Sequence, residues 1–221
     1  MQKVNVVIAK RNRHRHLDVC LRALDKSNTR SWFDVVVYVV DDSKIAYNPT
    51  FNCKNIKVVY THYTDTKSEL FNKSRLLNYV IANMRQNYDW FSMVDVDMLY
   101  AELFLDKVSR SINDQTICVC NGHNIGPQVS HSILNEKLTI HQTNMLDVAE
   151  GNSQTSMTKT VLELIKTIYG EVYCEEFAGW GGDAGSYAYP NHSLKSLLSV
   201  NECVSDNPDE TFLILKINEK G

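Results

Sequence analysis

The sequence predicts an α/β fold, a Rossmann-like nucleotide-binding arrangement with a mostly parallel central sheet and helices on both faces. Strands and helices alternate through about the first 100 residues, which is typical of a doubly wound sheet. The strands are continuously apolar, as expected for parallel strands that helices cover on both sides. Ligands of such sheets bind beyond the carboxyl ends of the strands.

The expected elements follow in order along the chain. The β-branched run at 4–9 predicts a buried strand, and leucines at helical spacing predict a helix over about 14–26. Further strands are expected at 33–43, 55–63, 90–100, 116–123 and 210–218. Further helices are expected at 67–87 and 155–170, and a glycine-rich loop at 177–190. No repeat or linker divides the second half, so we expect a single domain over 1–221.

The composition is that of an ordinary soluble protein, with 43% hydrophobic and 22% charged residues. The run KRNRHRHL at 10–17 is basic, but the formal net charge of -3 argues against a nucleic-acid-binding domain. No apolar run approaches the roughly 20 residues that span a bilayer, and the amino-terminal apolar run is too short for a signal peptide. We therefore expect a cytoplasmic protein without a transmembrane segment. The six cysteines form no C-x-x-C pair, and free thiols are favoured over disulfides.

Two of the predicted strands end in pairs of aspartates. Asp41 and Asp42 end one strand, and Asp95 and Asp97 end another. Residues i and i+2 of an extended segment share a face, so Asp95 and Asp97 can present two carboxylates to one region. Hard oxygen ligands suit Mg²⁺ or Mn²⁺, which also accept phosphate oxygens. The alternative is that these aspartates only terminate strands and cap the next element.

Two other features carry possible chemistry. In GWGGDAG at 179–185, glycines permit close backbone approach, and Trp180 can stack on a sugar ring or anchor a lid. The alternative is an ordinary loop whose tryptophan fills a core edge. Lys73 and Arg75 stand at the front of a predicted helix, where they either reach a phosphate or form its solvated face.

These segments together resemble the β-1,4-galactosyltransferase family. KRNRHRHL is similar to the family's F-R-N-R-x-x-H-L turn, and FNKSRLLN at 71–78 to its F-N-R-A-K-L-L-N helix, which leads into a strand ending in D-V-D. GWGGD at 179–183 resembles the family's G-W-G-G-E-D loop. The three blocks agree in order and rough spacing. The wider class is that of the GT-A fold glycosyltransferases, which includes chondroitin-polymerase-type inverting enzymes.

The resemblance implies a role for each matching residue. Arg11, Asn12 and Arg13 match the turn that holds the uridine and diphosphate of the donor. Lys73 matches a basic residue near the diphosphate. Asp41 and Asp42 stand where the wider class places acids that contact the nucleoside. Asp95 would contact ribose or a metal-bound water, and Asp97 would ligate Mn²⁺ (or Mg²⁺). Trp180 would cover the donor sugar, while Gly181 and Gly182 would let the loop approach it.

The chain departs from the family pattern at two places. The family's second loop acid is the usual candidate general base, but here Ala184 follows Asp183, which leaves Asp183 as the candidate. The family's histidine metal ligand lies about thirty residues after its glycine loop. The last histidine here is His192, which either completes the metal shell or is a solvent-facing turn residue.

The implied function is metal-dependent, inverting transfer of a sugar from a UDP-sugar to a hydroxyl of a glycan, glycolipid or protein. Residues 1–100 would form the nucleotide-binding half and 101–221 the acceptor-binding half. A bacterial or viral cytosolic enzyme fits this description. A sugar-nucleotide nucleotidyltransferase is an alternative, although AKRNRHR lacks the glycines that such enzymes usually carry after the first strand. A catalytically degenerate carbohydrate-binding subunit is another, since the second loop acid is missing.

Overall fold

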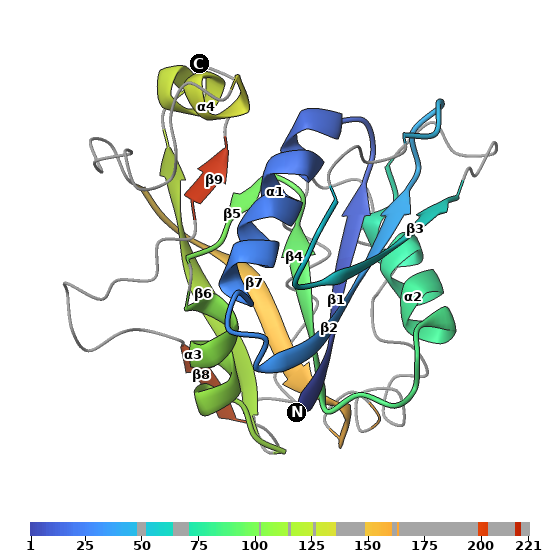
Figure 1. The fold of residues 1–221 in the computed structure, drawn as a ribbon, viewed down its shortest axis with the longest axis vertical. Coiled ribbons are helices and arrows are strands. Elements are labelled where there is room, and N and C mark those ends of the chain that lie inside the picture. The colour runs from blue at the N-terminus through green and yellow to red at the C-terminus, as the bar shows by residue number, and fades with distance from the viewer. Residues whose placement is uncertain are drawn as a thin grey trace.

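The structure is a computed structural model that describes residues 1–47, 52–63, 71–101, 103–114, 116–125, 127–135, 149–160, 163, 199–202 and 215–217. A single sheet runs through the described part of the chain, and α1 (His14–Ser27) crosses in front of its central strands (Figure 1). The other long helix is α2 (Lys73–Asn83), which packs on the opposite face. Among the described residues, no helix has the length and apolar character needed to cross a membrane.

The first half of the sheet is parallel, as the sequence predicts. Its strands lie side by side in the order β3 (Lys57–His62), β2 (Phe33–Asp41), β1 (Gln2–Lys10) and β4 (Trp90–Asp95). β1 pairs in parallel with both β2 and β4, so its last residue, Lys10, lies opposite Asp41. Because the carboxyl ends of parallel strands meet at one edge, the polar residues that end these strands gather there.

The second half of the sheet is mixed. β7 (Ala149–Thr158) is antiparallel to both β4 and β6 (Thr116–Ile125), and it joins the two halves. β6 also pairs in parallel with β8 (Ser199–Glu202) and β9 (Leu215–Ile217), and β5 (Met98–Leu99) is antiparallel to β9. Two short helices, α3 (Phe104–Ser111) and α4 (Pro127–Leu134), complete the described elements.

The continuous apolar character of β1 arises because both of its faces are buried. Val4, Val6 and Ile8 belong to the core cluster that contains the α1 leucines. Val7 and Ala9 point the other way, into the cluster formed with α2. Helices therefore cover both faces of the parallel strands, as the sequence predicts.

Several expected boundaries differ from those observed. The strand predicted over 90–100 ends at Asp95, turns at 96–97 and resumes as β5, because the chain leaves β1 to pair with β9. In the described part of the helix predicted over 67–87, α2 runs from Lys73 to Asn83 and stops where Met84 becomes extended. The helix predicted over 155–170 is wrong at 155–158, which pair as β7 between β4 and β6. Residues 159, 160 and 163 are helical.

The three cysteines whose side chains the structure describes are in two states. Cys20 and Cys53 carry free thiols, as expected. Cys118 is disulfide-bonded, so the expectation of free thiols is wrong at this position.

Candidate functional site

The turn at residues 11–13 has an unusual backbone. It follows β1 at the carboxyl edge of the sheet and leads directly into α1. Asn12 and Arg13 both adopt left-handed conformations, with φ of 59° and 55°. This region costs most non-glycine residues about 1–2 kcal/mol, and asparagine less, so contacts elsewhere help to hold the turn in shape.

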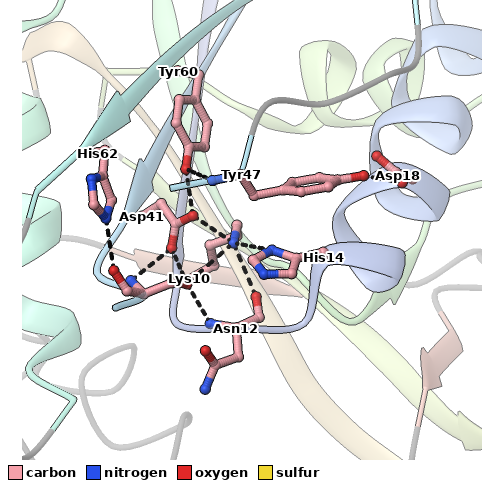
Figure 2. Close-up of polar contacts among 9 residues, drawn as sticks. Lys10, Asn12, His14, Asp18, Asp41, Tyr47, Tyr60 and His62 are labelled. Carbon is pink, nitrogen blue, oxygen red and sulfur yellow. Dashed lines mark hydrogen bonds and ion pairs between the residues drawn. The ribbon is translucent and has the colours of Figure 1, made fainter. Parts of the chain in front are cut away.

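Contacts from two strands supply that support (Figure 2). The Asn12 amide donates to Ser43 Oγ at 2.6 Å, just beyond the end of β2. The Lys10 ammonium, at the end of β1, donates to the Asn12 carbonyl at 3.0 Å. Both peptide groups that flank Asn12 are therefore hydrogen-bonded to other parts of the chain.

Lys10 forms a buried ion pair with Asp41. Nζ lies 2.7 Å from Asp41 Oδ2, and both side chains are fully buried. Asp41 also accepts hydrogen bonds from the Ser43 amide and hydroxyl and from the Tyr60 hydroxyl, the last at 2.5 Å. Burial alone would raise the pKa of Asp41, but the hydrogen bonds from Lys10, Ser43 and Tyr60 outweigh it and lower that pKa. Asp41 thus lies behind the turn, with its oxygens engaged by the protein rather than facing a ligand.

The other three aspartates at this edge each pair with a basic side chain of a neighbouring segment. The pairs are Arg11 with Asp42, Arg13 with Asp97, and Lys73 with Asp95. The Lys73–Asp95 distance is 2.5 Å, and Arg11 Nε donates to Asp42 at 3.1 Å. The structure thus brings these predicted residues to one edge. Arginine and lysine here offer the donors that bind phosphate oxygens.

Asp97 is not positioned by strand geometry. It lies in the turn after β4, so the same-face argument for an extended D-x-D does not apply. Asp95 and Asp97 are only two residues apart, and both carboxylates act on the thiol of Cys20. Burial, then Asp97, then Asp95 raise the pKa of that thiol.

The oxygen ligands at Asp95 and Asp97 fit a divalent cation that also binds phosphate oxygens. Asp95 and Asp97 supply hard carboxylate oxygens, and their side chains are 13% and 6% exposed. Among the described residues, no three histidine, cysteine or acidic side chains come together as a metal cage. An ion at this turn would therefore need further oxygens from a bound phosphate, from water or from the remaining parts of the chain.

Aromatic side chains that the sequence reasoning missed surround the turn. The His14 ring stacks on Tyr47 with centroids 4.3 Å apart, and the Arg11 guanidinium lies 5.7 Å from the centre of the Phe71 ring. Tyr60, on β3, was also missed. The sequence signal that could have identified Tyr60 was the polar carboxyl end of its strand. In the observed register His62 lies opposite Asp41, and Tyr60 lies two residues before His62.

The remaining predicted residues lie outside the described part of the chain. They are the glycine-rich loop and the candidate histidine ligand: Trp180, Gly181, Gly182, Asp183 and His192.

No family model matches the sequence, and no curated protein matches it. Solved structures do resemble the fold. S. aureus TarS 1-349 superposes with a TM-score of 0.53 at 17% identity, over 97% of this chain and 60% of that one. Its complex with UDP-GlcNAc gives 0.54 at 16% identity, over 99% and 59%. A Drosophila β-1,4-galactosyltransferase 7 mutant in complex with manganese, UDP-Gal and xylobiose gives 0.56 at 12% identity, over 96% and 70%.

These likenesses establish the fold. The chain adopts the GT-A arrangement of a mixed α/β sheet with a parallel central part. It spans about three fifths of the length of the TarS structure that it matches.

Proposed function

We propose that the chain is a glycosyltransferase that moves a sugar from a UDP-sugar to a hydroxyl of a carbohydrate-containing acceptor. One observation carries the proposal. Three cation–carboxylate pairs converge at the carboxyl edge of a GT-A sheet, where ligands of such sheets bind. The neighbours include structures bound to UDP-GlcNAc, and to UDP-Gal with manganese and xylobiose, which supports a UDP-sugar as donor.

The basic side chains of the cluster would bind the diphosphate. Arg11 and Arg13 are the first and last residues of the turn, and arginine forms forked contacts with phosphate. Lys73 begins α2, where backbone amides also favour an anion. Asn12 lies between the two arginines and belongs to the same proposed donor site. Among the strand-end acids, Asp42 lies beside Arg11 and is our candidate for the nucleoside contact.

Asp97, assisted by Asp95, would hold Mn²⁺ or Mg²⁺. When bound, the ion would neutralise charge on the departing UDP. Arg13 pairs with Asp97 through one of its carboxylate oxygens. The positive charge of Arg13 would compete with the ion for that carboxylate, and the diphosphate would offer Arg13 a replacement partner. Metal and nucleotide binding are coupled in this way.

The glycine-rich loop would supply the rest of the proposed machinery. Asp183 would take the proton from the acceptor hydroxyl as that hydroxyl attacks the anomeric carbon, giving inversion. A carboxylate with an ordinary pKa near 3.9 is a weak base, so it would act mainly through its position. Trp180, with Gly181 and Gly182, would cover the donor and exclude water, and His192 is the candidate third metal ligand.

The test is turnover by the purified chain with Mn²⁺ and a panel of UDP-sugars, each with an oligosaccharide acceptor. We expect UDP release together with a glycosylated product for at least one donor. Pyrophosphate release from a nucleoside triphosphate and a sugar phosphate would instead identify a nucleotidyltransferase. Glycan binding with no UDP release from any donor would identify a degenerate carbohydrate-binding subunit.

We also propose a cytoplasmic location and a bacterial or viral source. The disulfide at Cys118 weighs against a strongly reducing compartment. Counting free thiols in protein that is trapped with an alkylating reagent directly from its native cell tests the proposal. A trapped protein with the disulfide fully formed would contradict it.

A further inference from the structure

Lys10 is among the largest fully buried side chains of the described residues. Besides Asp41, its ammonium contacts three groups around the turn (Figure 2). They are the Asn12 carbonyl at 3.0 Å, His14 Nδ1 at 3.0 Å and Ser43 Oγ at 3.5 Å. Lys10 therefore links the turn, the first residue of α1 and the segment after β2.

Stability alone does not explain this arrangement. Removing two charges from water costs free energy that their mutual attraction often fails to recover, and well-packed apolar residues commonly serve as well or better. A sequence needing only a stable strand end at this point would fill it with apolar residues. The Lys10–Asp41 pair is distinguished by the further hydrogen bonds of Lys10 and of Ser43, which reach the turn at residues 11–13.

Those bonds fix the backbone of Asn12. Its amide belongs to the peptide group that joins it to Arg11, and that group is anchored on Ser43. Its carbonyl belongs to the peptide group that joins it to Arg13, and that group is anchored on Lys10. With both flanking peptide groups held, φ and ψ at Asn12 are set. The left-handed conformation is therefore maintained without glycine.

We propose that Lys10, Asp41 and Ser43 are positioning residues that hold the turn in the conformation that presents Arg11 and Arg13 to the donor diphosphate. They act through the turn and do not touch the donor. Lys10 and Asp41 are fully buried, whereas the Arg13 side chain is 50% exposed and available to a ligand. The inference rests on the proposed UDP-sugar site.

The test is the double variant Lys10→Met/Asp41→Asn. It removes both charges together, so no buried charge is left unpaired, and the asparagine keeps an acceptor for the Ser43 amide. Without the Lys10 ammonium, part of the free energy of donor binding must be used to bring the turn into its left-handed conformation. The strain of one left-handed residue corresponds to about a tenfold weaker UDP affinity at saturating Mn²⁺, measured by calorimetry. The donor KM rises by a similar factor, while kcat changes less than about threefold, because the turn binds ground state and transition state alike.

The matched control is Arg85→Met/Asp34→Asn. This ion pair has the same 2.7 Å distance and is partly buried, and Asp34 lies at the opposite end of β2 from Asp41. We expect the control to lower the melting temperature while UDP affinity stays within about twofold of the parent. A loss of UDP affinity in the control equal to that in the Lys10–Asp41 variant would overturn the proposal, because the effect would then be one of general stability.

The variant Ser43→Ala decides the matter if the double variant fails to fold by circular dichroism. It removes one anchor of the turn and leaves the ion pair in place, and we expect UDP affinity to fall by about threefold or more. If the parent binds UDP and the folded variants bind it within twofold of the parent, the positioning role is refuted. If the parent itself does not bind UDP with Mn²⁺, the proposed function is at fault instead.

Discussion

We predict that Arg13→Gln shifts Mn²⁺ binding and UDP binding in opposite directions. Arg13 pairs with Asp97, whose side chain is 6% exposed, while that of Arg13 is 50% exposed. Exposed ion pairs contribute about 0.2–1 kcal/mol, and a hydrogen bond to a charged group about 1.5–3 kcal/mol. Because half of the arginine faces solvent, we take about 1 kcal/mol for this pair.

That value sets the size of both effects. An ion that no longer competes with Arg13 for Asp97 gains about 1 kcal/mol, so Mn²⁺ without nucleotide binds roughly fivefold more tightly to the variant. At saturating Mn²⁺, UDP loses a charge-assisted contact of about 1.5–3 kcal/mol, so its affinity falls by roughly 10- to 100-fold.

The assay is a pair of titrations, Mn²⁺ followed by electron paramagnetic resonance and UDP followed by calorimetry. Arg15→Gln is the matched control, since Arg15 belongs to the same basic run but bonds to Asn135 on the outside of the molecule. It should leave both affinities unchanged. Mn²⁺ binding that is unaltered or weaker in Arg13→Gln would refute the reasoning that this arginine competes with the metal.

Three further predictions concern Asp183, Tyr60 and Asp41. Asp183→Asn should keep UDP binding and lose sugar transfer in the acceptor assay; a variant that turns over normally would place the base elsewhere. Tyr60→Phe removes the donor to Asp41 and should lower the free energy of unfolding by about 1–2 kcal/mol in urea, whereas an unchanged midpoint would show that the bond contributes nothing. The folded pKa of Asp41 lies below its ordinary 3.8, so its stabilising contribution is complete above that pH and is lost as the pH falls through the folded pKa. As the pH is lowered, the urea midpoint of unfolding should therefore fall less steeply in Lys10→Met/Asp41→Asn than in the parent. Equal slopes in the two proteins would count against this.

The parallel half of the fold could be predicted because burial on both faces leaves a local signal. β1 and β2 are mainly apolar, and each ends in a charged residue, Lys10 or Asp41, at the carboxyl edge of the sheet. The carboxyl edge, and with it the gathering of Arg11, Asp42 and Asp95, followed from that topology. β7 gave no such signal. Its sequence, AEGNSQTSMT, is mostly polar, and its strand state depends on pairing with β4 and β6.

The finer geometry of the site was not readable from the sequence. The left-handed turn depends on a contact between Asn12 and Ser43, which are 31 residues apart. Likewise, nothing local marks Lys10 as buried, since lysine at a strand end is normally solvated. Asp97 lies in a turn because the chain must leave β4 to form β5, which is a tertiary constraint.

The most direct test of the donor site is calorimetric titration of UDP into the purified chain, with Mn²⁺ and without it, in the parent and in Asp97→Ala. We predict metal-dependent UDP binding in the parent and its loss in the folded variant. UDP binding of equal strength in parent and variant, or no binding in the parent, would contradict the assignment of this edge of the sheet as a UDP-sugar site.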